Sequence, residues 1–331
     1  MVEMPRDPKI LFAYVSLYII WGSTYLALKE GQKSMSIDLF LGIRLFLAAF
    51  LNFAISYALI RNKFPLFTRE NLQEALKVAI IGALIIVSGQ GLTSLSMRYV
   101  DSHMAAVVIA GTPIYIVIMQ AMSGEKWSLS IQEAYGMGLG ILGIAILSYE
   151  EILIIFQRFT LTETGVGIFF AFLGSMLYGG FSYFTRNQIK MKDPLAVGGF
   201  QMLGASFVFL AFSLFSGGWS SQAFVAMTPG TWWALCYLVV FGSTIGHTAY
   251  SFIVRVEPPN RVYSYTYINP IIAILVGAWL GGENLKLQLI PASLAILLGV
   301  YFILGNQVLR KQGSPISVEK KVSPLTATND D

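Results

Sequence analysis

The chain has 331 residues, of which 55% are hydrophobic and only 12% carry a charge. Soluble domains carry roughly 25% charged residues, so this composition excludes an ordinary soluble enzyme or binding domain. No Asp, Glu, Lys or Arg occurs between Asp193 and Arg255, which leaves room for nearly three membrane spans of about 20 residues each. The single cysteine, Cys236, can form no internal disulfide. The sequence therefore predicts an integral membrane protein.

Continuous apolar runs follow one another along the whole chain. In order they lie at residues 10–28, 38–60, 74–97, 102–122, 132–149, 164–185, 194–215, 231–254, 262–280 and 288–307. The first run is aromatic and lacks a small-residue cleavage site, so we expect an uncleaved span. Membrane β-barrels need short alternating strands, which these runs do not show. The predicted fold class is therefore all-α, with ten transmembrane helices.

The second half of the chain repeats the first at a constant offset of 157 residues. Among the matched pairs are Gly22 with Gly179, Gly42 with Gly199, Gly89 with Gly246, Arg98 with Arg255 and Pro113 with Pro270. A register held this long indicates a duplicated unit of about 150 residues. We expect two five-span repeats at residues 10–149 and 164–307, joined by an outer linker at 150–163. Residues 1–9 and a polar, disordered tail at 308–331 would be cytoplasmic.

The distribution of Lys and Arg predicts how the spans are oriented. With the N-terminus in the cytoplasm, the loops place 15 of these residues inside and five outside. This agrees with the positive-inside rule, so both termini of this multi-pass protein should face the cytoplasm from the cell membrane, the inner or plasma membrane. Because each repeat has an odd number of spans, the second repeat must be inverted. Inverted repeats are typical of secondary transporters that alternate access around a midplane site.

Several stretches resemble the EamA-type branch of the drug/metabolite transporter superfamily. They are the opening WGSTYLALK of Trp21–Lys29, Arg44 in the second span, the Ala105-to-Pro113 spacing with its Pro113-Ile114 end, and the PIIAILVGAWLGGE of Pro270–Glu283. The resemblance covers residues 10–307. It implies a ten-helix bundle whose central cavity is lined mainly by spans 1, 3, 4, 6, 8 and 9. It also implies transport of small polar or amphipathic metabolites, often amino acids and usually outward. The second copy departs from the first in having Gln201 for Arg44 and Tyr178 for Trp21.

Uncharged polar and aromatic side chains inside the spans are the candidate substrate-binding residues. A polar stripe facing lipid would go unsatisfied, so these side chains should face the bundle interior or a wet cavity. In the ninth span Thr266 and Asn269 share one helical face, and Tyr267 lies on the adjoining one. The whole set comprises Trp21, Thr24, Tyr25, Gln90, Thr93, Tyr178, His247, Tyr250, Thr266, Tyr267 and Asn269. The alternative is that the polar members only tie helices together.

Two prolines at equivalent positions are candidate gating elements. Pro113 and Pro270 each remove a backbone donor in mid-span, which frees the carbonyls of Ile109 and Thr266 and bends the helix. Equivalent prolines in an inverted pair suggest symmetric gates. The alternative is that each kink only shapes packing.

Two ionisable residues within spans have more than one interpretation. Arg44 is a possible charge partner for a substrate carboxylate, or it reaches interfacial water, or it pairs with Asp38. His247 could titrate near neutral pH and couple transport to protons, but it could equally be a neutral hydrogen-bonding residue. No Asp or Glu is evident deep within a span, since Glu283 closes its span. A carboxylate proton relay is therefore not expected.

The sequence contains no constellation that would support catalysis. The two histidines are far apart and no clustered carboxylates or P-loop occur, so we expect no enzyme activity, no catalytic residue, no metal and no cofactor. The expected partners are a small-molecule substrate and the lipid bilayer, without nucleic acid, and a homodimer is left open. A non-transporting receptor would not require an inverted repeat.

The candidate cavity also limits the substrate. Its aromatic rings suit amphipathic or aromatic solutes, whereas nucleotide sugars would need several Lys or Arg clamps. We expect export of small metabolites such as neutral or aromatic amino acids. The alternative substrates are hydrophobic drugs or toxic amphiphiles.

Overall fold

The computed structural model describes residues 8–60, 69–112, 114–115, 119, 131–147, 149, 153, 162–185, 188–256 and 265–313. All regular elements of this part are helical, and it contains no strand. The elements are α1 Pro8–Gly31, α2 Ile37–Ile60, α3 Arg69–Ile86, η1 Val87–Gly91, α4 Leu92–Ser96, α5 Ser102–Ile109, α7 Ile131–Leu147, α9 Glu163–Thr185, α10 Pro194–Phe215, α11 Ser221–Val225, α12 Pro229–Tyr237, η2 Leu238–Gly246, α13 His247–Val256, α15 Tyr265–Trp279 and α16 Leu289–Gly313.

Helices occupy the predicted apolar runs. Among the described residues, five helical stretches are long and apolar enough to cross a membrane: Pro8–Gly31, Ile37–Leu59, Asn71–Ser96, Glu163–Thr185 and Pro194–Phe215. Shorter apolar helices occupy Ala134–Leu147, Ile268–Trp279 and Leu289–Phe302. The run predicted at 102–122 is described as a helix chiefly over α5. The all-helical membrane fold is confirmed, whereas the count of ten crossings stays a prediction.

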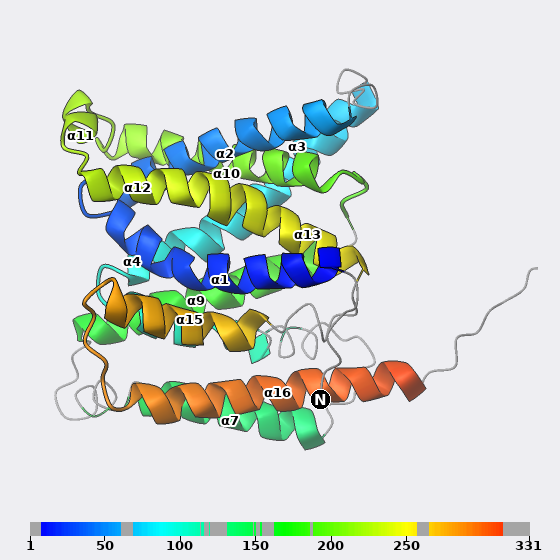
Figure 1. Ribbon diagram of the computed structural model, residues 1–331, viewed down its shortest axis with the longest axis vertical. Helices are drawn as coiled ribbons and strands as arrows, with labels where there is room; N and C mark the ends of the chain where they lie inside the picture. Colours follow the sequence, from blue (N-terminus) through cyan, green and yellow to red (C-terminus); the bar gives the residue numbers. More distant parts are fainter. Residues whose placement is uncertain are drawn as a thin grey trace, which may run out of the picture.

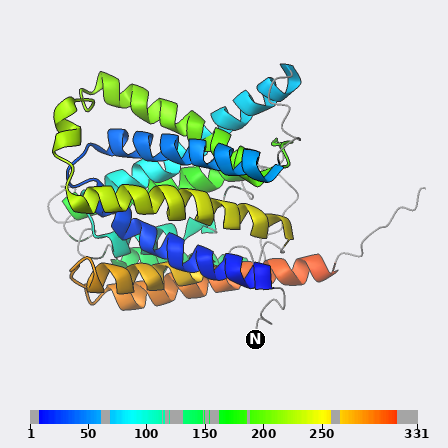
Figure 2. The same cartoon turned by 45° about the horizontal axis from the view of Figure 1, so that its top comes forward.

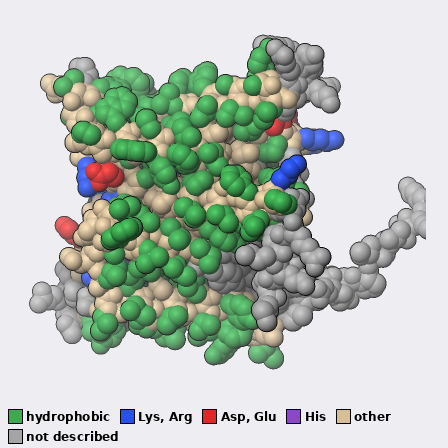
Figure 3. Space-filling view, viewed as in Figure 1, with side chains coloured by type: hydrophobic (Ala, Val, Ile, Leu, Met, Phe, Trp, Pro, Cys, Tyr) green, Lys and Arg blue, Asp and Glu red, His purple; other side chains and the backbone are tan. Residues whose placement is uncertain are grey.

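The helices lie side by side and run between two faces of the molecule (Figure 1). α1 begins and α16 ends at the right-hand face, here called the N-terminal face, and α1 ends at the opposite face, here called the Lys29 face. Figure 2 shows the same layering from a second direction. The charged side chains visible in Figure 3 gather at these two faces, and the band between them is hydrophobic. This distribution suits a slab of lipid around the middle of the bundle.

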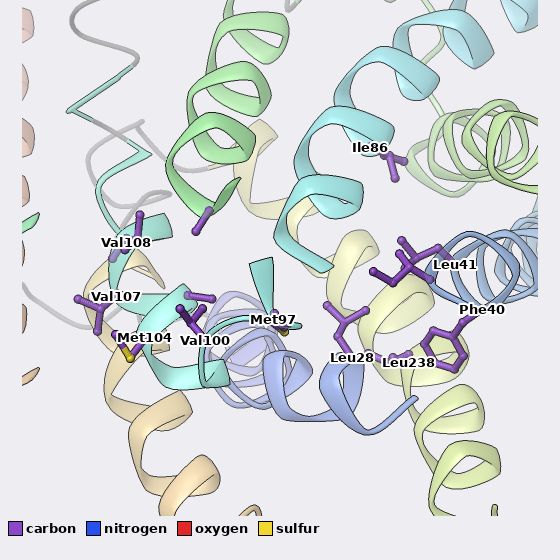
Figure 4. Packing of buried hydrophobic residues seen from close by; sticks show 14 of the residues in the cluster. Leu28, Phe40, Leu41, Ile86, Met97, Val100, Met104, Val107, Val108 and Leu238 are labelled. Carbon is purple, nitrogen blue, oxygen red and sulfur yellow. The ribbon is translucent and has the colours of Figure 1, made fainter. Parts of the chain in front are cut away.

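Large apolar side chains cover the outside as well as the core. Phe12, Trp233 and Trp279 are 70%, 70% and 88% exposed, as expected where the solvent is hydrocarbon. Inside, buried apolar side chains form a smaller cluster between α1, α13 and α15 and a large cluster that joins most of the helices. Figure 4 shows Leu28 of α1 and Leu238 of η2 within it. Both sides of the helices are therefore apolar, so polar residues in the interior need a specific explanation.

The two halves of the chain pack through reciprocal contacts. A Cβ added at Gly42 of α2 would lie 2.6 Å from the Leu210 side chain of α10, and one added at Gly199 of α10 would lie 2.5 Å from the Phe53 ring of α2. The offset of 157 relates Gly42 to Gly199 and Phe53 to Leu210. Each half thus makes the same contact with the other, as two-fold-related copies do. In Figure 1, α2 and α10 run in opposite directions, as an inverted second copy requires.

Candidate substrate site

The first repeat packs closely against the second at the π-helix η2. Trp21 of α1 donates from Nε1 to the backbone oxygen of Gly242 at 3.4 Å. Thr24, one turn later, has its methyl group 3.1 Å from the position a Cβ at Gly242 would occupy. A Cβ at Gly246 would lie 2.5 Å from Trp21 Nε1. A side chain at position 246 would displace Trp21, and one at position 242 would press on the Thr24 methyl group, so both glycines help the first helix to approach η2 closely.

Arg44 of α2 reaches the same place from another side. Its side chain is buried, with 3% of the residue exposed. Nε donates to Ser243 Oγ at 3.2 Å and Nη1 donates to Gln90 Oε1 at 3.1 Å. Nη2 lies 3.5 Å from the Cβ position of Gly242. Arg44, Gln90 and the η2 segment therefore form one buried polar centre.

The possible pairing of Arg44 with Asp38 is wrong. Asp38 accepts a hydrogen bond from Ser216 Oγ at 3.1 Å instead. Nor does Arg44 extend to the interface, because it is almost fully buried. In the part of the chain that the structure describes, the guanidinium has no carboxylate within ion-pair distance. Its acceptors are neutral oxygens.

Both partners of Arg44 stand in π-helical turns. Gln90 lies in η1 and Ser243 in η2. A π-turn inserts an extra residue per turn, re-aims the neighbouring side chains and is frequent at functional sites. The sequence analysis missed these turns because it treated each span as a regular helix. The glycines at positions 89, 91, 242 and 246 were the available signal.

Trp21 and its counterpart Tyr178 make reciprocal contacts. Tyr178 of α9 lies against Gly89 of η1, 2.8 Å from the position a Cβ would take, just as Trp21 lies against Gly246 of η2. The offset of 157 relates both members of each pair. The site therefore sits where two equivalent helix–π-turn contacts meet, even though the two aromatic residues differ.

Trp21 and two further aromatic rings, each from a different helix, lie close together. The ring centroids of Trp21 and Tyr250 lie 5.2 Å apart, as do those of Trp21 and Tyr265, and Tyr250 and Tyr265 are 6.0 Å apart. His247 is 6.5 Å from Tyr250 and its ring lies against Gly198 of α10. Tyr265 was not among the predicted site residues. Its position four residues before Asn269 placed it on the same helical face.

Several other predicted site residues have different surroundings. Asn269 is 5% exposed, and its amide nitrogen donates to the backbone oxygens of Tyr265 and Tyr18 at 3.2 and 3.3 Å when the amide is oriented to suit its neighbours. Thr93 is buried in α4, and Tyr25 packs against the apolar core. The side chains of Thr266 and Tyr267 lie outside the described residues. The structure thus brings together Trp21, Thr24, Arg44, Gln90 and the π-helix η2, with Tyr250 beside them.

Only one of the two predicted gating prolines can be placed. Pro270 lies inside α15, which continues through it to Trp279. Pro113 lies outside the described residues, but α5 ends at Ile109 just before it. The hydroxyl of Thr112 donates to the Ile109 carbonyl at 2.6 Å. The carbonyl that Pro113 was expected to free therefore has a partner.

A separate polar cluster joins the two repeats at the Lys29 face. Glu283, which follows α15, accepts hydrogen bonds from Lys29 Nζ at 3.0 Å, from Ser102 N and Oγ at 2.9 Å each, and from His103 Nδ1 at 2.8 Å. Lys29 also pairs with Asp101. Asp101 is the N-cap residue of α5 but makes no side-chain cap bond. Glu283 therefore caps α5 from the other repeat.

The Glu283 carboxylate is held in its charged form. Burial alone would raise the pKa of this carboxyl, but the hydrogen bonds from His103, the Ser102 backbone and Lys29 hold its pKa well below the usual range. The carboxylate also faces the first backbone N–H groups of α5, where a negative charge is favoured. Although Glu283 closes its span as expected, its side chain is only 4% exposed.

Among the described residues no group of three or more metal-ligating side chains occurs. An apolar helical bundle with two equivalent halves and a buried polar centre between them is the architecture of a membrane transporter. Sequence comparison identifies the kind: the EamA-like transporter family matches residues 8–149 and again 165–305, and the chain belongs to that family. The suspected resemblance is thus confirmed.

Several similar proteins carry transporter names. The chain is 29% identical to the "Uncharacterized inner membrane transporter YedA" of Escherichia coli K12, over 89% of this chain and 90% of that protein. It is 24% identical to the "Uncharacterized transporter YoaV" of Bacillus subtilis, over 88% and 96%. A solved structure titled only "Crystal structure of protein" shares the fold, with a TM-score of 0.62, 15% identity and coverage of 94% and 100%.

Proposed function

We propose that this protein is a secondary transporter of the inner membrane that exports small metabolites, such as neutral or aromatic amino acids, by alternating access. The observation that carries the proposal is the convergence of polar and aromatic side chains from both repeats on η2, inside an otherwise apolar bundle. The YedA relative is named an inner membrane transporter. The positive-inside bias of the loops supports cytoplasmic termini.

The energetic cost of the polar centre supports a functional role. An arginine at the centre of a membrane helix costs about 2.5–3.5 kcal/mol on insertion scales, and Arg44, the eighth of the 24 residues of α2, lies between the end and the centre, where a smaller part of this cost applies. Two hydrogen bonds to neutral acceptors contribute roughly 0.5–3 kcal/mol each, and pairing Arg44 with a carboxylate within the fold would have offset its charge directly. A residue kept buried at this cost is a functional candidate by default.

The aromatic rings supply the other half of the proposed site. Trp21, Tyr250 and Tyr265 form an apolar wall next to η2. Such rings receive the side chain of an aromatic or aliphatic amino acid, and a ring pair is worth about 0.5–1.5 kcal/mol beyond area burial. Asn269 would position this wall, because its amide ties the Tyr265 backbone of α15 to α1.

Alternating access requires the two repeats to separate at one face at a time. At the Lys29 face, which is the outer face in the proposed orientation, Glu283 of the second repeat is bonded to Lys29, Ser102 and His103 of the first. We place the outward release step at this face, and these bonds would break during it. Pro270, in the helix that precedes Glu283, remains the candidate hinge.

A flux assay in proteoliposomes tests the proposal. Liposomes loaded with unlabelled leucine or phenylalanine should accumulate the labelled compound by exchange, with a rate that saturates. Tyr250→Ala should lower this rate, whereas Tyr301→Ala, which removes a ring that is 62% exposed on α16, should not. Flux that does not saturate, or that equals flux into protein-free liposomes, refutes transport of these substrates. Saturable movement of a hydrophobic dye alone would support the drug-export alternative.

A further inference from the structure

Two buried serine hydroxyls at the Lys29 face have no hydrogen-bond partner among the described residues. Ser36 directly precedes α2, and Ser213 lies in the last turn of α10. Ser213 is fully buried as a residue. Other serines of this chain, such as Ser206, donate to a backbone carbonyl of the preceding turn. Buried hydroxyls without a partner are rare and costly in folded proteins, so this pair calls for an explanation.

The two hydroxyls converge with a carboxylate beside Gly218, which follows α10. Around the position that a Cβ at Gly218 would take, Ser36 Oγ lies at 2.7 Å, Ser213 Oγ at 2.9 Å and Asp38 Oδ2 at 3.1 Å. Asp38 Oδ2 also accepts a hydrogen bond from Ser216 Oγ at 3.1 Å. Four oxygen-bearing side chains, two from each repeat, therefore gather where α2 begins and α10 ends (Figure 1).

The Asp38 carboxylate has no cationic side chain within ion-pair distance in the part of the chain that the structure describes. Lys33, in the loop before α2, is paired with Glu30 instead. Asp38 lies in the first turn of α2, where a negative charge is favoured. The same group of oxygens adjoins the C-terminus of α10, where a positive charge is favoured. A bound cation would balance the carboxylate, whereas a bound anion would be repelled by it.

The equivalent place at the opposite face shows what Ser213 lacks. The offset of 157 relates Ser56 to Ser213 and Ser36 to Asp193. Ser56 Oγ donates to Asp193 Oδ2 at 2.5 Å, so this hydroxyl is satisfied by the carboxylate that caps α10. At the Lys29 face a serine takes the place of that carboxylate. Asp38 stands two residues further along, and an ion bound between them would join its carboxylate to both hydroxyls.

We infer that Ser36, Asp38 and Ser213 bind a sodium ion, which ties the start of α2 to the end of α10 at the Lys29 face. Hydroxyl and carboxylate oxygens are ligands of hard cations, and a single carboxylate balances a single positive charge. Helix C-terminal ends also take part in the sodium sites of some membrane transporters. This inference goes beyond the proposed function and does not depend on it.

The melting temperature of the purified full-length protein tests the inference. It is measured in sodium chloride and in choline chloride at the same ionic strength. Sodium should raise the melting temperature by about 2 °C or more and saturate, because an ion that binds only the folded state stabilises it by mass action. Equal melting temperatures in the two salts overturn the inference. A larger rise in calcium chloride than in sodium chloride overturns the assignment to a monovalent ion.

Three variants locate the ion. Asp38→Asn and Ser213→Ala each remove a ligand and should abolish the rise caused by sodium. Ser56→Ala is the matched control, because it deletes the equivalent hydroxyl, whose partner is Asp193. It should lower the melting temperature in both salts and keep the rise caused by sodium. An unchanged rise in Asp38→Asn or Ser213→Ala, or its loss in Ser56→Ala, overturns the assignment.

The sodium NMR line provides a measurement that does not depend on stability. A sodium ion that exchanges with a site on a large protein gives a broader resonance than the free ion. Wild type and Ser56→Ala should therefore broaden the sodium line more than Ser213→Ala does at the same concentrations. Equal line widths for wild type and Ser213→Ala overturn the inference, even if Asp38→Asn fails to fold.

Discussion

Replacing Glu283 by alanine should destabilise the protein strongly, because one carboxylate binds three residues on two helices of the first repeat, α1 and α5. It receives the Lys29 ammonium from α1, caps the N-terminus of α5 through Ser102, and accepts from His103. His103 is fully buried. The substitution therefore removes the bonds between the two repeats at this cluster and leaves several donors without an acceptor.

The magnitude follows from the kinds of bond that are lost. Removing one partner of a buried charged pair typically costs about 3–5 kcal/mol, and loss of a helix cap alone costs about 0.5–2 kcal/mol. Lys29 keeps Asp101 as a partner, which reduces the first figure. We therefore expect Glu283→Ala to lower the free energy of unfolding by roughly 3 kcal/mol. Glu283→Gln keeps an acceptor for α5 and should cost less.

Thermal unfolding of purified protein in detergent measures the effect. The melting temperature should be highest for the wild type, lower for Glu283→Gln and lowest for Glu283→Ala. Glu163→Ala is the control, since it also removes one carboxylate from a helix start, but an exposed one. Its effect should stay within the few tenths of a kcal/mol that a helix-dipole interaction supplies.

A melting temperature of Glu283→Ala equal to that of Glu163→Ala would refute the reasoning. It would mean that water replaces the lost carboxylate at no cost and that the cluster does not hold the repeats together.

The remaining predictions concern pH, substrate selectivity, hinge motion and topology. The pKa of Glu283 in the folded protein lies below its ordinary value of 4.5. The stabilisation that its charge supplies is therefore complete above about pH 4.5 and is lost as the pH falls towards the folded pKa. The difference in melting temperature between wild type and Glu283→Gln should be constant near neutrality and shrink on acidification. Trp21→Ala should weaken binding of phenylalanine more than that of leucine, by roughly two- to tenfold, because it removes a stacking surface; equal losses in a calorimetric titration would contradict this. Pro270→Ala should restore one helical hydrogen bond and lower the transport rate more than the yield of folded protein, and an unchanged rate in the flux assay would leave the proline a packing feature. Arg98 and Arg255 should lie on opposite sides of the membrane although they are repeat equivalents; labelling of single cysteines from each side would show the same sidedness if the repeats were not inverted.

The sequence by itself determined that the protein spans a membrane and that its two halves are copies of one unit. Hydrocarbon offers no hydrogen bonds, so a spanning segment must be a helix or part of a closed barrel, and long uncharged runs therefore specify helices directly. The duplication could be detected from matching residue types at a constant offset of 157 residues. The reciprocal contacts of Gly42 and Gly199 follow the same offset. Trp21, Arg44 and Gln90 could be singled out because polar and aromatic side chains stand out in apolar helices.

Only the tertiary structure decided what those residues touch. Arg44 is 46 residues from Gln90 and 199 from Ser243, so no local pattern could choose these partners over Asp38. Their approach depends on how far each helix is rotated, and the π-turns of η1 and η2 change that rotation in a way that apolar periodicity does not reveal. The sequence likewise showed Glu283 only as the end of a span. Helix packing brings its carboxylate to the N-terminus of α5, where it binds the Ser102 backbone N–H. The N-cap residue of α5, Asp101, is bound to Lys29 instead. Side-chain partnerships between helices are set by packing, which the periodicity of one helix does not encode.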